Sequence, residues 1–92
     1  MNYAHWVTQS QPVFYGAGRI THIVLTATSA GVADITLYEG RDDAGKVLAV
    51  IKAAADGTRH VSMGRGLPVS SGLYVKLGSN VEGVLVLWEP AE

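Results

Sequence analysis

Residues 19–40, RITHIVLTATSAGVADITLYEG, contain the clearest structural pattern in the chain. The first half of this stretch, Arg19–Ser29, is rich in β-branched residues, whose side chains fit the pleated surface of a sheet. Its second half, Val32–Glu39, alternates apolar and polar residues, as an antiparallel strand with one buried face does. The short segment Ser29-Ala30-Gly31 between them predicts a turn. The side chains expected to face the core are Ile23, Leu25 and Ala27 in the first half and Ala33, Ile35 and Leu37 in the second.

Short β-prone runs closed by Gly, Asp or Ser recur along the rest of the chain. Lys46–Ala55 is ambiguous because Ala and Leu also favour helices, but its alternation favours a strand with Val47, Ala49 and Ile51 on one face. Asp56-Gly57 predicts a hairpin turn, with Arg59–Met63 as the returning strand. The other expected strands are Pro12–Tyr15, Leu67–Val69 as an edge or crossover segment, Leu73–Leu77, and Val84–Trp88 with both faces covered.

These runs predict a single all-β domain with no helix. About seven or eight short strands, spaced at intervals of about 8–12 residues, are typical of an antiparallel β-sandwich. We assign residues 16–92 to the sandwich and residues 1–15 to an N-terminal arm or first strand.

The size of the chain points to association with other subunits. A chain of 92 residues hides only roughly 60–65 % of its unfolded surface, and such thin cores usually rely on disulfides, a metal or oligomerisation. Cysteine is absent, so disulfides are excluded. The histidines, His5, His22 and His60, lie far apart in the sequence, and a metal site would require distant residues to converge. We therefore predict no metal and no cofactor, and expect a homo-oligomer.

The charges argue against two classes of partner. Only 16 % of residues are charged, against about 25 % in an average soluble domain, and the net charge is −1. The seven basic residues are scattered, so no stripe exists to follow a nucleic-acid backbone. No apolar stretch approaches the length of about 18 residues that a membrane span needs. Residues 1–11 do not resemble a secretory signal, so we expect synthesis in a cytoplasm.

Candidate catalytic patterns are weak. Ser62 lies in HVSMG, which lacks the first glycine of a nucleophile elbow. Asp42-Asp43 lacks the alternating acids of the well-known calcium loops and is typical of a solvated turn. Gly16-Ala17-Gly18 and Gly64-Arg65-Gly66 lack the following helix of a nucleotide loop and predict turns or bulges. We predict no catalytic residue and expect that the protein is not an enzyme.

Aromatic residues are the most informative candidates for binding. Four of them crowd the first fifteen residues, where they either fill one end of the core or anchor a neighbouring subunit, as Tyr and Trp often do. Trp88 is expected in the core or at a subunit seam. Tyr38 and Tyr74 are expected to point away from the core and would form a sugar-binding platform if they were neighbours. The predicted partner-interface residues are Tyr3, Trp6, Phe14 and Tyr15.

Two segments resemble small β-sandwich virion proteins of tailed bacteriophages. They are DITLYEG (Asp34–Gly40) and GLPVSSGLYVKLGSNVEGVLVLWEP (Gly66–Pro90). The shared features are a strand that ends in a Tyr-acid-Gly turn, a Gly-Leu-Pro-Val bend, a Gly-Leu-Tyr-Val strand and a final apolar strand. The resemblance covers most of residues 16–90, and the family includes head decoration (cement) proteins.

The resemblance implies a jelly-roll-like sandwich that forms a homotrimer on the capsid surface of the virion. It implies a structural role, in which the trimer docks on the major capsid protein and stabilises contacts between capsid subunits. The family has no active-site motif, so no residue inherits a catalytic role. The alternatives are a small tail or neck component and a carbohydrate- or receptor-binding module.

Overall fold

The computed structural model describes residues 3–90, which form eight strands and no helix. The predicted all-β class is therefore confirmed; residues 1, 2, 91 and 92 of the predicted segments lie outside the described range. The strands are β1 (Tyr3–Val7), β2 (Gln11–Phe14), β3 (Gly18–Ala27), β4 (Ala33–Glu39), β5 (Lys46–Ala53), β6 (Thr58–Val69), β7 (Leu73–Leu77) and β8 (Val81–Pro90).

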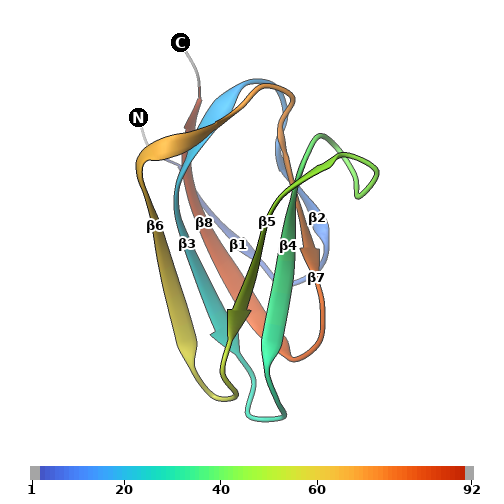
Figure 1. The fold of residues 1–92 in the computed structure, drawn as a ribbon, viewed down its shortest axis with the longest axis vertical. Helices are drawn as coiled ribbons and strands as arrows, with labels where there is room; N and C mark the ends of the chain where they lie inside the picture. The colour runs from blue at the N-terminus through green and yellow to red at the C-terminus, as the bar shows by residue number, and fades with distance from the viewer. Residues whose placement is uncertain (1–2, 91–92) are drawn as a thin grey trace.

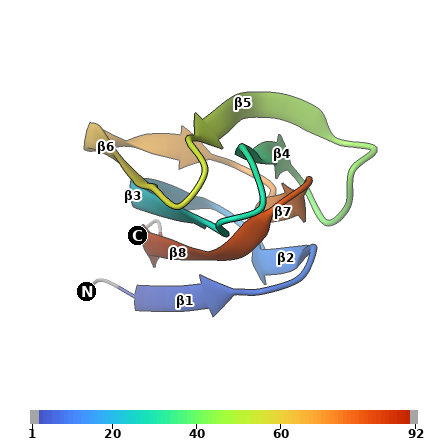
Figure 2. The ribbon, with the colours of Figure 1, turned by 90° about the horizontal axis from the view of Figure 1, so that it is seen from below.

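The strands form two antiparallel four-stranded sheets that pack face to face. The first sheet has the order β1-β8-β3-β6 and the second sheet the order β2-β7-β4-β5. Figure 2 separates them, with β1, β8, β3 and β6 following one another on one side and β2, β7, β4 and β5 on the other. This order is that of a jelly roll, as the fold prediction expected.

Successive strands alternate between the two sheets, except at one link. Only β4 and β5, among the described strands, are both consecutive in sequence and paired in one sheet. The loops between β2 and β3, β4 and β5, and β6 and β7 therefore gather at one end of the sandwich, at the top of Figure 1. We call this the upper end.

The predicted hairpin at Asp56-Gly57 is wrong, although the turn is present. Asp56 has a φ of 60°, and the Gly57 N–H donates to the Ala54 carbonyl at 2.9 Å. The strands on its two sides do not pair with each other, because β5 pairs with β4 and β6 pairs with β3. The turn instead carries the chain from the edge of the second sheet to the edge of the first.

The core follows the alternation of the sequence. The inward faces of β3 and β4 are buried at every predicted position. No polar or charged residue is buried within the described range, so desolvation of polar groups does not oppose packing. The predicted core residues that are 4 % exposed or less are Ile23, Leu25, Ala27, Ala33, Ile35 and Leu37.

A β-bulge corrects the prediction for β5. Leu37 pairs with Ala49 but Tyr38 pairs with Val47, so Leu48 is an extra residue in the ladder. A single extra residue reverses the faces beyond it, which is why Val47 is 52 % exposed although it was expected to share a face with Ala49 and Ile51.

A larger bulge interrupts β6 at the Gly64-Arg65-Gly66 segment. Ile20 pairs with Leu67 and His22 with Ser62, so four residues of β6 face a single residue of β3. Gly64 and Gly66 have φ values of 62° and 103°, which glycine adopts without a steric penalty. This segment was predicted to be a turn or a bulge, and it is a bulge inside an edge strand.

Strand β8 occupies the centre of the first sheet, between β1 and β3. Its inward residues Val84 and Val86 are fully buried. Leu85 and Leu87, on the outer face, are only half-buried, so the prediction that both faces of this strand are covered is wrong for the outer face. No helix in the described residues is long and apolar enough to cross a membrane.

Candidate binding surfaces

The N-terminal aromatic segment is built into both sheets of the sandwich. Strand β1 pairs with β8 in the first sheet, and β2 pairs with β7 in the second. Phe14 is only 4 % exposed and stacks on Trp88 with the ring centroids 4.2 Å apart, so it belongs to the core and offers no surface to a partner. Of the four predicted interface residues, the exposed ones are Tyr3, Trp6 and Tyr15.

Strand β1 forms one edge of the first sheet and carries two exposed aromatic rings. Tyr3 is 45 % exposed and stacks on Trp88 with the centroids 5.0 Å apart. Trp6 is 50 % exposed, and its indole lies against Gly83, where a Cβ atom would collide with the ring. The missing side chain at Gly83 thus lets the indole lie against β8. We call β1 with these two rings the β1 edge.

Tyr15 lies at the upper end, away from the β1 edge. It is 64 % exposed, and the Arg41 guanidinium lies 5.4 Å from the centre of its ring, within the range of a cation–π contact. Strand β2 ends at Phe14 and β3 begins at Gly18, so Tyr15 lies in the loop between the two sheets. The aromatic cluster of the sequence is therefore divided between the core, one sheet edge and one loop.

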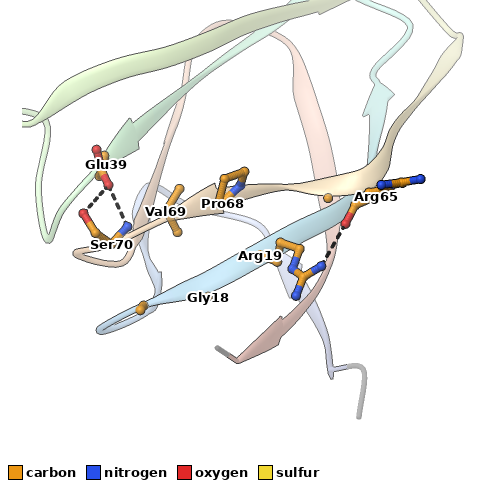
Figure 3. Close-up of a pocket in the computed structure, with 9 residues that line it drawn as sticks. Gly18, Arg19, Glu39, Arg65, Pro68, Val69 and Ser70 are labelled. Carbon is orange, nitrogen blue, oxygen red and sulfur yellow. Dashed lines mark hydrogen bonds between the residues drawn. The ribbon is translucent and has the colours of Figure 1, made fainter. Parts of the chain in front are cut away.

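A cleft of about 550 Å³ opens where β3, β4 and the end of β6 meet at the upper end. Two arginines line it, and the Arg19 guanidinium donates to the Arg65 carbonyl at 3.3 Å and lies 3.7 Å from the Glu89 carboxylate. Figure 3 shows Glu39 and Ser70 at the other end of the cleft. The cleft thus combines cationic, acidic and hydroxyl groups.

Hydrogen bonds hold the carboxylate of Glu39 in its charged form. The backbone N–H of Ser70 donates to Glu39 Oε2 at 2.7 Å, and the Ser70 hydroxyl donates to the same oxygen at 2.9 Å. These bonds, the backbone one first, lower the pKa of Glu39 below its ordinary value. The carboxylate therefore fastens the β6–β7 loop to the end of β4, and its role is structural.

Tyr38 and Tyr74 are neighbours on the outer face of the second sheet. They are directly opposite in the β4–β7 ladder, and their ring centroids are 6.4 Å apart at an interplanar angle of 57°. Next to Tyr74 on the same face, Lys76 binds Asp43 with Nζ 3.1 Å from Oδ2, and this contact raises the pKa of the lysine. The two tyrosines are therefore neighbours, as a sugar-binding platform would require.

His22 and His60 meet on the outer face of the first sheet, although 38 positions separate them in the chain. Their rings contact each other through His22 Nδ1 and His60 Nε2, which are 3.1 Å apart. Nothing in the local sequence indicated this pair, because it depends on the β3–β6 ladder. Within residues 3–90, no group of three or more His, Cys, Asp or Glu side chains is placed to hold a metal ion.

Comparisons with known proteins assign no family. No protein-family model matches the chain, and no curated protein sequence matches it. Among solved structures, the crystal structure of PirA is similar, with a TM-score of 0.49 and 15 % sequence identity over 96 % of this chain and 92 % of the PirA chain.

Proposed function

We propose that this domain is a non-enzymatic structural subunit of a tailed-phage particle, a capsid decoration protein that docks on the head as a homotrimer. In this role it binds the major capsid protein and stabilises contacts between capsid subunits at the virion surface. The observation that carries the proposal is the β1 edge, where two half-exposed aromatic rings lie beside a strand edge that no other described strand pairs with.

The β1 edge has two features that suit docking. Tyr and Trp are enriched among the residues that contribute most to protein–protein affinity, and Tyr3 and Trp6 each keep about half of their surface available. Strand β1 is also the last strand of its sheet, so its outer backbone groups pair with no other strand among residues 3–90. An edge of this kind can accept a strand from a partner.

The outer face of the first sheet extends the β1 edge. Leu85 and Leu87 on β8 are half-buried there, directly opposite Trp6 and Ala4 in the ladder with β1. Specific interfaces bury about 1,200–2,000 Å² in total, more than two side chains supply. A trimer that presents three such edges to several capsid subunits also multiplies weak contacts through multivalency.

Replacing Trp6 with alanine should weaken docking without unfolding the domain. Capsids that lack the protein are mixed with it and sedimented, and the bound fraction is measured against concentration. We expect the wild-type chain to co-sediment and Trp6→Ala to bind at least about tenfold more weakly, because interface anchors of this type contribute about 2 kcal/mol or more. The thermal midpoint of the free domain should stay nearly unchanged.

Val50→Ala is the matched control, because Val50 is 56 % exposed but lies on β5, in the other sheet. It should bind capsids as the wild-type chain does. Failure of the wild-type chain to co-sediment would remove the decoration role and leave the fold intact. A strictly monomeric protein by light scattering at high concentration would contradict the homotrimer.

A second candidate function is carbohydrate binding, favoured by the adjacency of Tyr38 and Tyr74. Sugars stack on aromatic rings; both tyrosines are half-buried, and the Lys76–Asp43 pair beside them supplies polar groups that can bind hydroxyls. A glycan array probed with the wild-type chain tests this candidate. A hit that Tyr74→Ala abolishes and Trp6→Ala leaves intact would place the sugar on the second sheet and count against the decoration role.

A further inference from the structure

We propose that His22 and His60 form a binding site for a divalent transition-metal ion such as Zn²⁺, on the outer face of the first sheet. The site shares this face with Leu87, which lies opposite His22 in the β3–β8 ladder, but the inference does not rest on the proposed docking role. Neutral imidazole is a preferred ligand of Zn²⁺, Cu²⁺ and Ni²⁺, and two ring nitrogens are already together here.

The backbone holds the two histidines in place. His22 lies on β3, which pairs with β8 on one side and with β6 on the other. In the β3–β6 ladder, His22 is opposite Ser62 and Val24 is opposite His60, so the two histidines are diagonal neighbours that share the outer face. Diagonal neighbours in an antiparallel pair lie about 7–8 Å apart at Cα, which long or aromatic side chains can span.

The distance between the nitrogens suits chelation. Two nitrogens that each lie about 2.0–2.1 Å from one ion are about 2.9–3.4 Å apart for angles at the ion between square-planar and tetrahedral values. His22 Nδ1 and His60 Nε2 are 3.1 Å apart, within this range. The rings are stacked, with centroids 5.2 Å apart at an interplanar angle of 27°, so they must rotate to turn both lone pairs towards a common ion. His60 is exposed and His22 half-buried, so the remaining positions on the ion are open to water.

Metal binding requires a change in where the ring protons lie. In the metal-free pair one of the two facing nitrogens donates a hydrogen and the other accepts it. When an ion takes both lone pairs, the donating ring moves its proton to its other nitrogen, and no proton is lost from two neutral rings. The bound state therefore has a defined tautomer for each residue: His22 carries its proton on Nε2 and His60 on Nδ1.

The test uses the full chain and ZnCl₂ alone, followed by long-range ¹H–¹⁵N spectra of the imidazoles. Zn²⁺ is raised in steps to about 1 mM, where a site with a millimolar dissociation constant is half filled. We expect the signals of His22 and His60 to shift together, to report the two tautomers named above, and to return on addition of EDTA. His5, on β1, hydrogen-bonds Gln11 and should not shift with them.

Matched variants distinguish Zn²⁺ binding at the His22–His60 pair from weak Zn²⁺ binding by any exposed histidine. Loss of a group that merely orients a metal ligand costs about 10–100-fold in affinity, so His22→Gln and His60→Gln should each bind at least about tenfold more weakly. His5→Gln should bind as the wild-type chain does. Thermal unfolding checks each variant, and His60→Gln at an exposed position keeps the test valid if His22→Gln fails to fold.

Two results would overturn the proposal. One is the absence of any shift in both imidazoles at the highest Zn²⁺ concentration. The other is a pair of single variants that bind Zn²⁺ as tightly as the wild-type chain, since the ion would then be held elsewhere.

Discussion

Phe14→Ala should lower the free energy of unfolding by about 3–5 kcal/mol, the usual cost of removing a buried aromatic ring. The ring is 4 % exposed and stacks on Trp88 at a centroid distance of 4.2 Å and an interplanar angle of 18°. It also packs against Gly18, whose missing Cβ leaves room for the ring. Domains of this size are stable by only about 5–14 kcal/mol, so the loss is a large share of the total. Urea unfolding followed by tryptophan fluorescence measures it.

Tyr15→Ala is the matched control for Phe14→Ala. The two aromatic residues are adjacent in sequence, but Tyr15 is 64 % exposed and contacts Arg41 only across a cation–π distance of 5.4 Å. Its replacement should change the free energy of unfolding by less than about 1 kcal/mol. Equal losses for the two variants would contradict the division of the N-terminal segment into core and surface.

Gly72→Ala should destabilise the domain by about 2–4 kcal/mol, through two effects that act together. Gly72 has a φ of 100°, a conformation that residues with a Cβ rarely adopt. A Cβ at this position would also lie 2.5 Å from the carbonyl oxygen of Phe14, and a backbone atom cannot move aside by changing rotamer. The change would therefore force the β6–β7 loop away from the end of β2. Thermal and urea unfolding both report the loss.

Gly64→Ala separates the two effects. Gly64 also has a positive φ, 62°, but a Cβ there would meet no atom within 4 Å. Its replacement should cost only about 1–2 kcal/mol, the penalty for the left-handed conformation alone. If Gly72→Ala is no more destabilising than Gly64→Ala, the close approach of the loop to β2 is not a real constraint.

Strand positions and faces were predictable because they depend on neighbours along the chain. The alternation in Val32–Glu39 corresponds to β4, and Leu73–Leu77 coincides with β7, in which Leu73 and Val75 are fully buried. Backbone geometry sends successive side chains of a strand to opposite faces, so a local pattern is enough. One exception is Val47, where the bulge at Leu48 reverses the faces, and no local residue pattern indicates that extra residue.

Candidate sites were less predictable, because they depend on pairs of residues that the chain keeps apart. The sequence singled out Tyr3, Trp6 and Tyr15, which are exposed, but grouped them with Phe14, which is buried. Aromatic side chains serve cores and interfaces equally well, so residue type alone does not separate the two roles. Whether such a side chain is buried depends on the strand that it belongs to and on the face of that strand.

The all-β class, and the side of most strands that faces the core, can be read from the residue pattern alone. Which strands become neighbours depends on the folded arrangement, and with it the contacts of His22 with His60 and of Tyr38 with Tyr74. The turn at Asp56-Gly57 shows the reason. Its local geometry is compatible with a hairpin and with a crossing between sheets, and the choice depends on the apolar surface buried when β6 pairs with β3 rather than β5. That free energy belongs to contacts between distant segments, so no window of the sequence contains it.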